Sequence, residues 1–250
     1  MSNQSKQNQA ALLYAIIAEG TQLNTVNTGL FGMKLEIVTG GGLNAIVSWH
    51  EASALTEVLG KENEDQIKDL VIDYHTLLNE LSAHVDLLPV RFGTAFPDGD
   101  AIARHLETNL DDLKSQISRV RGHQEWTILL SENTRDEAPS AADPKDYLRA
   151  RQLAKKAKLE AEKGRVDLVN KLLVPHDLGV AEAWCDTVSK ESAAQGVFAT
   201  IKLLVQRSTD QAFLAKLSAI IEGEAGVDAS VIGPEAPFAF ARIESQNDAA

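Results

Sequence analysis

The sequence predicts an α+β protein built from two modules, and two observations support this. Short apolar runs of strand length alternate along the chain with stretches whose apolar residues recur every three or four positions, as in amphipathic helices. A polar stretch containing Pro139 interrupts the pattern at residues 131–142. Because 250 residues can bury two cores, we expect an N-terminal domain at 1–122 and a C-terminal domain at 123–250.

The N-terminal module is expected to be a small antiparallel or mixed sheet with helices. The apolar run 12–17 predicts a strand, and glycines 40–42 between the runs 35–38 and 43–49 predict a hairpin, since glycine tolerates positive φ in a tight turn. An apolar stripe over 67–81 predicts a helix, 87–92 a strand, and 98–120 a second helix ended by Gly122.

The C-terminal module is expected to be ferredoxin-like, with an antiparallel sheet covered by helices on one face. Its predicted order is strand 125–130, long helix 143–174, strands 180–186 and 196–206, helix 209–222 and strand 227–232. That order is the split βαβ arrangement. Asp143 can cap the long helix, and Pro144 suits its first position because the missing N–H has no helical partner there.

Charge and composition exclude several classes of protein. A net charge of −12 repels phosphate, so nucleic-acid binding is not expected. No apolar run approaches the roughly 18 residues of a membrane span, and no signal-like segment opens the sequence. The lone cysteine, Cys185, suits a reducing compartment and is expected to be buried. A cytoplasmic protein is the interpretation these features favour.

No pattern of catalytic or cofactor-binding residues stands out. None of the six histidines has another at the i, i+4 spacing of a zinc helix, so no metal is expected. The sequence contains no phosphate-binding loop, dinucleotide fingerprint or nucleophile elbow. We therefore expect a chain that is not an enzyme and carries no cofactor.

Three segments carry residues suited to docking a partner protein. The long helix concentrates cations, among them Arg149 and Arg151, in an otherwise acidic chain. These cations form either a solvated helix face or a docking stripe for an acidic surface. Arg91 and Phe92 end a predicted strand. The closing segment combines two prolines with two aromatic residues: Pro234, Pro237, Phe238 and Phe240. It can anchor in a partner's groove or pack on its own sheet.

Five motifs follow one another along the chain: Leu-Leu-Tyr-Ala-Ile at 12–16, Leu-Pro-Val-Arg-Phe-Gly-Thr at 88–94, Gly-His-Gln-Glu-Trp at 122–126, Tyr-Leu-Arg-Ala-Arg at 147–151 and Gly-Pro-x-x-Pro-Phe-x-Phe at 233–240. In this order they resemble the gas vesicle protein F/L family. In the closing motif, Glu235-Ala236 and Phe238 replace the family's usual tryptophan-proline and tyrosine.

The resemblance implies a minor gas vesicle protein, located at the gas vesicle and in the cytoplasm. It implies that the chain binds the major shell protein, which is small and hydrophobic, and other minor gas vesicle proteins. By covering exposed apolar surface and strand edges, such a protein would prevent shell aggregation and assist vesicle nucleation and assembly. Two alternatives stay open: a cytosolic enzyme or small-ligand-binding module on a ferredoxin-like fold, and a wall component with no chaperone role.

Overall fold

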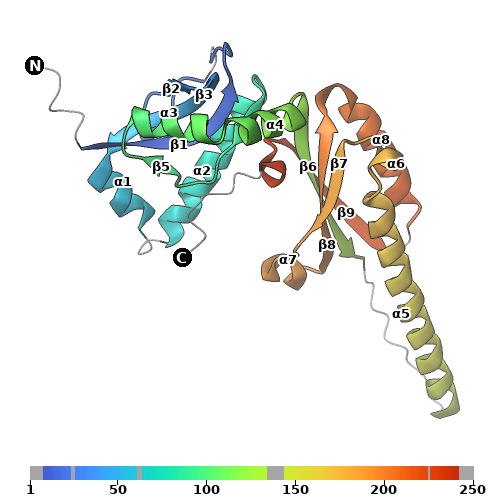
Figure 1. Cartoon of the computed structure of the whole chain (residues 1–250). Coiled ribbons are helices and arrows are strands. Elements are labelled where there is room, and N and C mark those ends of the chain that lie inside the picture. Colours follow the sequence, from blue (N-terminus) through green and yellow to red (C-terminus); the bar gives the residue numbers. More distant parts are fainter. Residues whose placement is uncertain (1–7, 24–25, 61–63, 134–143, 225, 242–250) are drawn as a thin grey trace, which may run out of the picture. The chain divides into compact units, whose positions relative to one another are not determined.

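The computed structural model describes residues 8–23, 26–60, 64–133, 144–224 and 226–241 (Figure 1). These residues form two compact units. The first contains the described residues up to Glu125 together with those from Pro234 onward, and the second runs from Trp126 to Gly233. The chain passes between the units twice, within one strand at residues 125–126 and within another at 233–234. The sequence assigned the closing segment to the C-terminal domain, whereas its contacts place it in the first unit.

The first unit is built on an antiparallel sheet with strand order β2-β3-β1-β4, and β5 also pairs with β1. The strands are β1 (Gln9–Ala18), β2 (Glu36–Gly40), β3 (Leu43–Glu51), β4 (Leu87–Pro89) and β5 (Ala95–Phe96). The predicted glycine turn joins β2 to β3, and Gly41 and Gly42 have φ values of 60° and 80°. Both values suit the tight turn that matches the twist of a hairpin.

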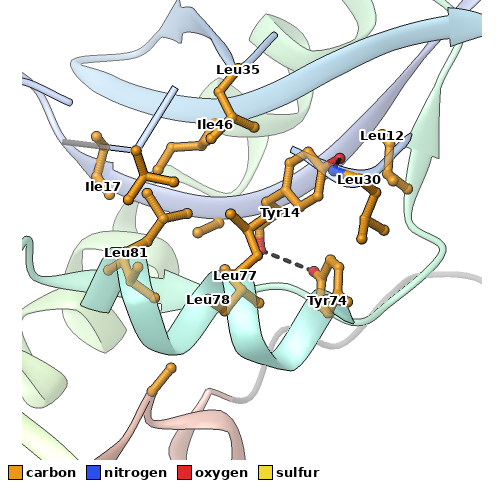
Figure 2. Close-up of a cluster of buried hydrophobic side chains, with 14 of the residues drawn as sticks. Leu12, Tyr14, Ile17, Leu30, Leu35, Ile46, Tyr74, Leu77, Leu78 and Leu81 are labelled. Atoms are coloured by element: carbon orange, nitrogen blue, oxygen red, sulfur yellow. Dashed lines mark hydrogen bonds between the residues drawn. The ribbon is translucent and has the colours of Figure 1, made fainter. Parts of the chain in front are cut away.

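Helices cover both faces of this sheet. Helix α2 (Glu64–Ser82) places its predicted apolar stripe on one face, in a core with β1 and β3 (Figure 2). Helices α3 (Gly99–Thr108) and α4 (Leu110–Val120) contact the same strands, but their buried side chains lie outside that core. Because neighbouring strand residues point to opposite faces, these two helices cover the other side. A short helix that the sequence did not reveal, α1 (Ala52–Leu59), follows β3.

The prediction of a single helix at 98–120 is wrong, because the helix is interrupted at Asn109. This residue has φ −105° and ψ 18°, and it ends α3 and begins α4. Its side-chain Nδ2 donates to the His105 carbonyl at 2.8 Å. Asparagine often competes with a helix in this way, by bonding to backbone groups of the preceding turn. At the start of α3, Asp98 caps the Ala101 N–H at 2.7 Å.

The second unit has the predicted element order and a four-stranded sheet of order β7-β8-β6-β9. Its elements are β6 (His123–Glu132), α5 (Pro144–Leu172), α6 (Pro175–Leu178), β7 (Glu182–Asp186), α7 (Lys190–Ala194), β8 (Val197–Gln206), α8 (Asp210–Glu222) and β9 (Val227–Glu235). The helical connections β6–β7 and β8–β9 each skip one strand, as a split βαβ sheet requires. Residues of α5 and α8 share one core with β6 and β8.

Helix α5 is supported by the sheet only near its C-terminal end. Leu168 and Leu172 are buried in the core, whereas the side chains of residues 151–163 are exposed. Figure 1 shows this N-terminal part projecting away from the rest of its unit. The predicted helix cap, Asp143, lies outside the described residues. Gly164 does not divide the helix, which runs through it.

Cys185 is exposed, so the prediction of a buried thiol is wrong. It lies in β7, the edge strand of the second sheet, with Ile201 of β8 as its only cross-strand neighbour among the described residues. An edge strand has a neighbour on one side only, which leaves its side chains more accessible than those of a central strand.

The strand predicted at 87–92 ends at Pro89, because the next residues leave the sheet in a tight turn. Gly93 has φ 84°, and Thr94 bonds to the Arg91 carbonyl through both its amide and its hydroxyl. The chain then rejoins β1 as β5. On the opposite side, β1 has a register shift between Leu13 and Ala15.

The hydroxyl of Tyr74 connects helix α2 to the turn after Pro89 and to the register shift in β1. It donates to the Val90 carbonyl at 2.6 Å and lies 3.0 Å from the Tyr14 carbonyl, the contact drawn in Figure 2. The Val90 amide bonds to the same Tyr14 oxygen at 3.0 Å. Tyr74 is 1% exposed, and burial raises the pKa of its hydroxyl, so this group stays a neutral donor.

Removing that hydroxyl should therefore lower the stability of the fold by more than the loss of a single oxygen atom suggests. We expect Tyr74→Phe to lower the free energy of unfolding in urea by about 1–3 kcal/mol, because the Val90 carbonyl loses a buried donor. Thr76→Val is a matched control on the same helix, since the Thr76 hydroxyl is exposed and bonds only within its own turn. Equal stability of the two variants would contradict this role for Tyr74.

Candidate docking surface

The structure brings together two aromatic residues that the sequence predicted as docking groups. Phe92, from the turn after β4, packs against the Tyr74 ring with centroids 5.3 Å apart. Phe238, from the closing segment, lies over the next residue of the same helix, His75, at 4.1 Å. Both are partly buried against the α2 core. Arg91, beside Phe92, is exposed.

The closing segment is held by its own unit over residues 236–240. The Ala236 amide donates to Asn79 Oδ1 at 2.8 Å, and the Ala239 amide donates to Glu125 Oε2 at 2.7 Å. Arg119 donates to the Phe240 carbonyl and stacks on its ring. We call this stretch the closing strap. Its residues Pro237 and Phe240 are buried, so they are not available for a partner's groove in this structure, whereas Pro234 is exposed.

The remaining predicted docking residues, Arg149 and Arg151, belong to the other unit. Both are exposed on the projecting part of α5. The predicted set therefore falls into two groups: one collected around α2 in the first unit and one on α5 in the second.

A different surface, which the sequence did not indicate, lies at the edge of the first sheet. Strand β2 is an edge strand and pairs only with β3 among the described residues. Phe31, Met33 and Ile37, in β2 and the segment leading into it, are 48%, 38% and 40% exposed. We call these three side chains the apolar rim. Single exposed apolar residues are ordinary, but three within seven positions beside an open strand edge indicate a binding surface.

A buried relay of hydrogen bonds supports the loop that carries Phe31. The Leu30 amide donates to the Tyr14 hydroxyl at 3.1 Å; that hydroxyl lies 2.7 Å from Ser48 Oγ, which lies 2.6 Å from His50 Nε2. The Leu30 N–H can only donate, so the Tyr14 hydroxyl accepts from it, whereas the direction of the Tyr14–Ser48 and Ser48–His50 bonds depends on the His50 tautomer. The Phe31 ring packs edge-on against the His50 ring at 5.5 Å.

Phe31 has a backbone conformation that bulky residues rarely adopt. Its φ of 58° places it in the left-handed region, where it is the only non-glycine residue among those described. Strain of this kind, which costs on the order of 1–3 kcal/mol, persists only where the surroundings enforce it. Here the relay fixes the preceding residue and the His50 ring supports the side chain, so an exposed aromatic group is held at the sheet edge.

The described residues offer no evident centre for chemistry. No group of three or more His, Cys, Asp or Glu side chains is placed to hold a metal ion within the described ranges. Ser48 and His50 form the nearest approach to a nucleophile–base pair, but Ser48 is fully buried, so a substrate cannot reach it. None of the described helices is long and apolar enough to cross a membrane.

The relay predicts a dependence of stability on pH. Burial lowers the pKa of His50, so the folded state binds a proton less readily than the unfolded state. The free energy of unfolding should therefore fall as the pH drops below about 6.5, the ordinary histidine value. Burial lowers the pKa of His105 too, so part of the decline should persist when His50 is replaced.

We expect His50→Gln to show a smaller loss of stability than the natural chain between about pH 7 and pH 5, because it removes one of these two histidines. Urea unfolding across this pH range measures the difference. Parallel stability curves for the two proteins would contradict the role assigned to His50.

The closing strap gives a second prediction. Asn79→Ala should lower the free energy of unfolding by about 1–3 kcal/mol, since the buried Ala236 amide loses its acceptor. It should also speed proteolysis near residues 234–241. Asn79→Asp, which keeps an acceptor oxygen in place, should retain the strap. Equal cleavage rates in both variants and the natural chain would rule out this anchoring.

Comparisons with known proteins agree with this fold and these motifs. The chain matches the model of the family described as "Gas vesicle synthesis protein GvpL/GvpF" over residues 10–242. It is 25% identical over 197 residues to gas vesicle protein L of Streptomyces sp. (strain CB03234), covering 74% of each chain.

Two crystal structures share the fold. Gas vesicle protein GvpF from Anabaena sp. PCC7120 superposes with a TM-score of 0.67 at 15% identity, over 95% of this chain and 98% of that one. GvpF from Microcystis aeruginosa gives a TM-score of 0.68 at 14% identity, over 94% and 99%. The family match spans both units, and on this evidence the chain belongs to the gas vesicle synthesis protein GvpL/GvpF family.

Proposed function

We propose that this chain binds the small hydrophobic shell protein of the gas vesicle and prevents its aggregation until the shell protein joins the growing wall. Membership of the GvpL/GvpF family gives the chain a gas vesicle role. The observation that carries the finer proposal is the apolar rim beside the open edge of β2. Other gas vesicle proteins are further partners under this proposal.

Strand edge and apolar side chains together suit a partner that is itself apolar and prone to pair through strands. The outer side of β2 can offer backbone N–H and C=O groups to an added strand, which supplies affinity without sequence preference. Phe31, Met33 and Ile37 can then cover apolar side chains of the added strand. Because each is 38–48% exposed in the free chain, covering it would contribute about half of the roughly 1.5–3 kcal/mol of complete side-chain burial, which suits a reversible complex.

The rest of the chain suits a carrier that keeps an insoluble partner dispersed. The net charge of −12 favours the solubility of a complex between the two proteins. In the first unit, helices cover both faces of the sheet, which leaves the strand edge as the place where backbone groups are open. The first unit offers one such apolar edge, which limits how many shell subunits can add there, so this sheet does not become a template for aggregation.

The proposal is tested by co-expressing the chain with the shell protein and measuring how much shell protein is recovered in soluble complex by pull-down. Met33→Lys combined with Ile37→Lys should reduce the recovered shell protein at least about tenfold, since two lysines replace the apolar surface and a loss of 1.4 kcal/mol already gives a factor of ten.

Ile72→Lys combined with Val174→Lys is the matched control. It also replaces two exposed apolar side chains by lysine, at positions outside β2 and the segment leading into it, and should leave recovery unchanged. The proposal fails if the natural chain forms no soluble complex under conditions where vesicles form, or if the control pair weakens recovery as much as the rim pair.

A further inference from the structure

Helix α5 presents a positively charged arm on an acidic protein. Residues 149–158 contain five cations and no carboxylate, and residues 149–163 contain six cations and two carboxylates, a net charge of +4. The chain as a whole has a net charge of −12, so the remaining residues carry −16. We call residues 149–163 the basic arm.

The basic arm has little support from the rest of its unit. All its side chains are exposed except that of Ala150, which is half-buried. Its one ion pair among the described residues joins Lys156 and Glu160 at 3.8 Å, in full solvent. A helical segment with no packed apolar face is marginal in water unless something binds it.

Three of the arm's cations, Arg151, Lys155 and Lys158, lie on one side of the helix at i, i+4 and i+7. None of them makes an ion pair with a residue that the structure describes. Like charges at these spacings repel one another and destabilise an isolated helix by a few tenths of a kcal/mol per pair. An acidic partner would remove that repulsion. Leu159, 67% exposed, lies beside Lys155 and Lys158 and adds an apolar contact point.

The first unit carries the complementary surface on the solvent side of α2. Asp69, Asp73 and Glu80 are exposed at positions i, i+4 and i+11, which places them along one face over roughly 16 Å. They too make no ion pair within the described ranges. Ile72, 62% exposed, lies among them as Leu159 lies among the cations. We call these three carboxylates the acidic stripe.

We infer that the basic arm of one copy of this chain docks on the acidic stripe of a second copy. Each surface combines a row of charges that form no ion pair with any residue described in the structure and one strongly exposed aliphatic side chain, and the two rows have opposite signs. Because the two surfaces differ, the contact is head-to-tail, which leads to an open string or a closed ring of copies. The inference uses neither β2 nor the apolar rim, so it stands apart from the shell-protein proposal.

Sedimentation velocity at increasing protein concentration tests the self-association. In about 50 mM salt the average mass of the natural chain should rise above that of the monomer with concentration. In about 1 M salt, where the screening length falls to about 3 Å, it should return to the monomer value. An average mass that stays at the monomer value in low salt, or a mass independent of salt, would overturn the inference.

Charge-neutralising variants then identify the two surfaces. Arg151→Gln/Lys155→Gln/Lys158→Gln and Asp69→Asn/Asp73→Asn/Glu80→Gln should each weaken self-association at least tenfold. Glutamine retains a good helix propensity, and circular dichroism checks that each variant is folded. Lys34→Gln/Lys114→Gln/Lys190→Gln removes three exposed cations elsewhere and should associate like the natural chain.

Mixing the two neutralised variants gives the decisive result. Each retains one intact surface, so the mixture should form a one-to-one complex that grows no further, although neither variant associates alone. Absence of that complex, or a loss of association with the control triple, means that the arm does not dock on the stripe. In that case its acidic partner is another molecule. Shell-protein recovery with the same variants should remain normal, which keeps this test separate from that of the proposed function.

Discussion

The hydrogen bonds of the Tyr74 hydroxyl hold the first unit in register. Strand β1 pairs with β3 along its whole length, but on its other side it meets β4 and then β5, with a turn between them. A strand interrupted in this way leaves backbone groups without ladder partners, and a buried carbonyl without a donor is costly. The Tyr74 hydroxyl donates to the Val90 carbonyl and also lies within hydrogen-bond distance of the Tyr14 carbonyl. These contacts join helix α2, the turn after β4 and the register shift in β1.

This arrangement makes the two edges of the sheet unequal. At the β4 edge, the chain leaves the sheet after Pro89 in a tight turn and rejoins β1 as β5, so this edge is interrupted. At the β2 edge, the relay from Leu30 to His50 instead supports an exposed aromatic side chain in a strained conformation. A sheet with one open, apolar edge, on an acidic protein, is suited to hold one aggregation-prone chain at a time.

Sequence periodicity was sufficient to predict the elements whose geometry depends on neighbouring residues in the chain. The apolar stripe of α2 and the paired glycines 41 and 42 specify their own geometry, and the element order of the second unit follows from such local signals. The break at Asn109 was invisible because apolar spacing continues across it, while the break itself depends on one side-chain bond to the preceding turn.

The candidate site was harder to predict, since it depends on contacts between distant residues. Asn79 and Ala236 are 157 positions apart, so nothing local shows that the closing segment is anchored intramolecularly. Phe31 and Ile37 look like ordinary core residues until strand pairing shows that β2 lies at an edge. Glu125, directly before the apolar run 126–130, was the available signal, because a carboxylate that is buried there requires donors from elsewhere in the chain.

Hydrogen–deuterium exchange with and without the shell protein tests the central claim most directly. If β2 receives an added strand, the β2 amides that face away from β3 should exchange quickly in the free chain and become protected in the complex, while those of α5 stay unchanged. Protection confined to other parts of the chain, with residues 30–40 unaffected by a bound shell protein, would contradict docking at this edge.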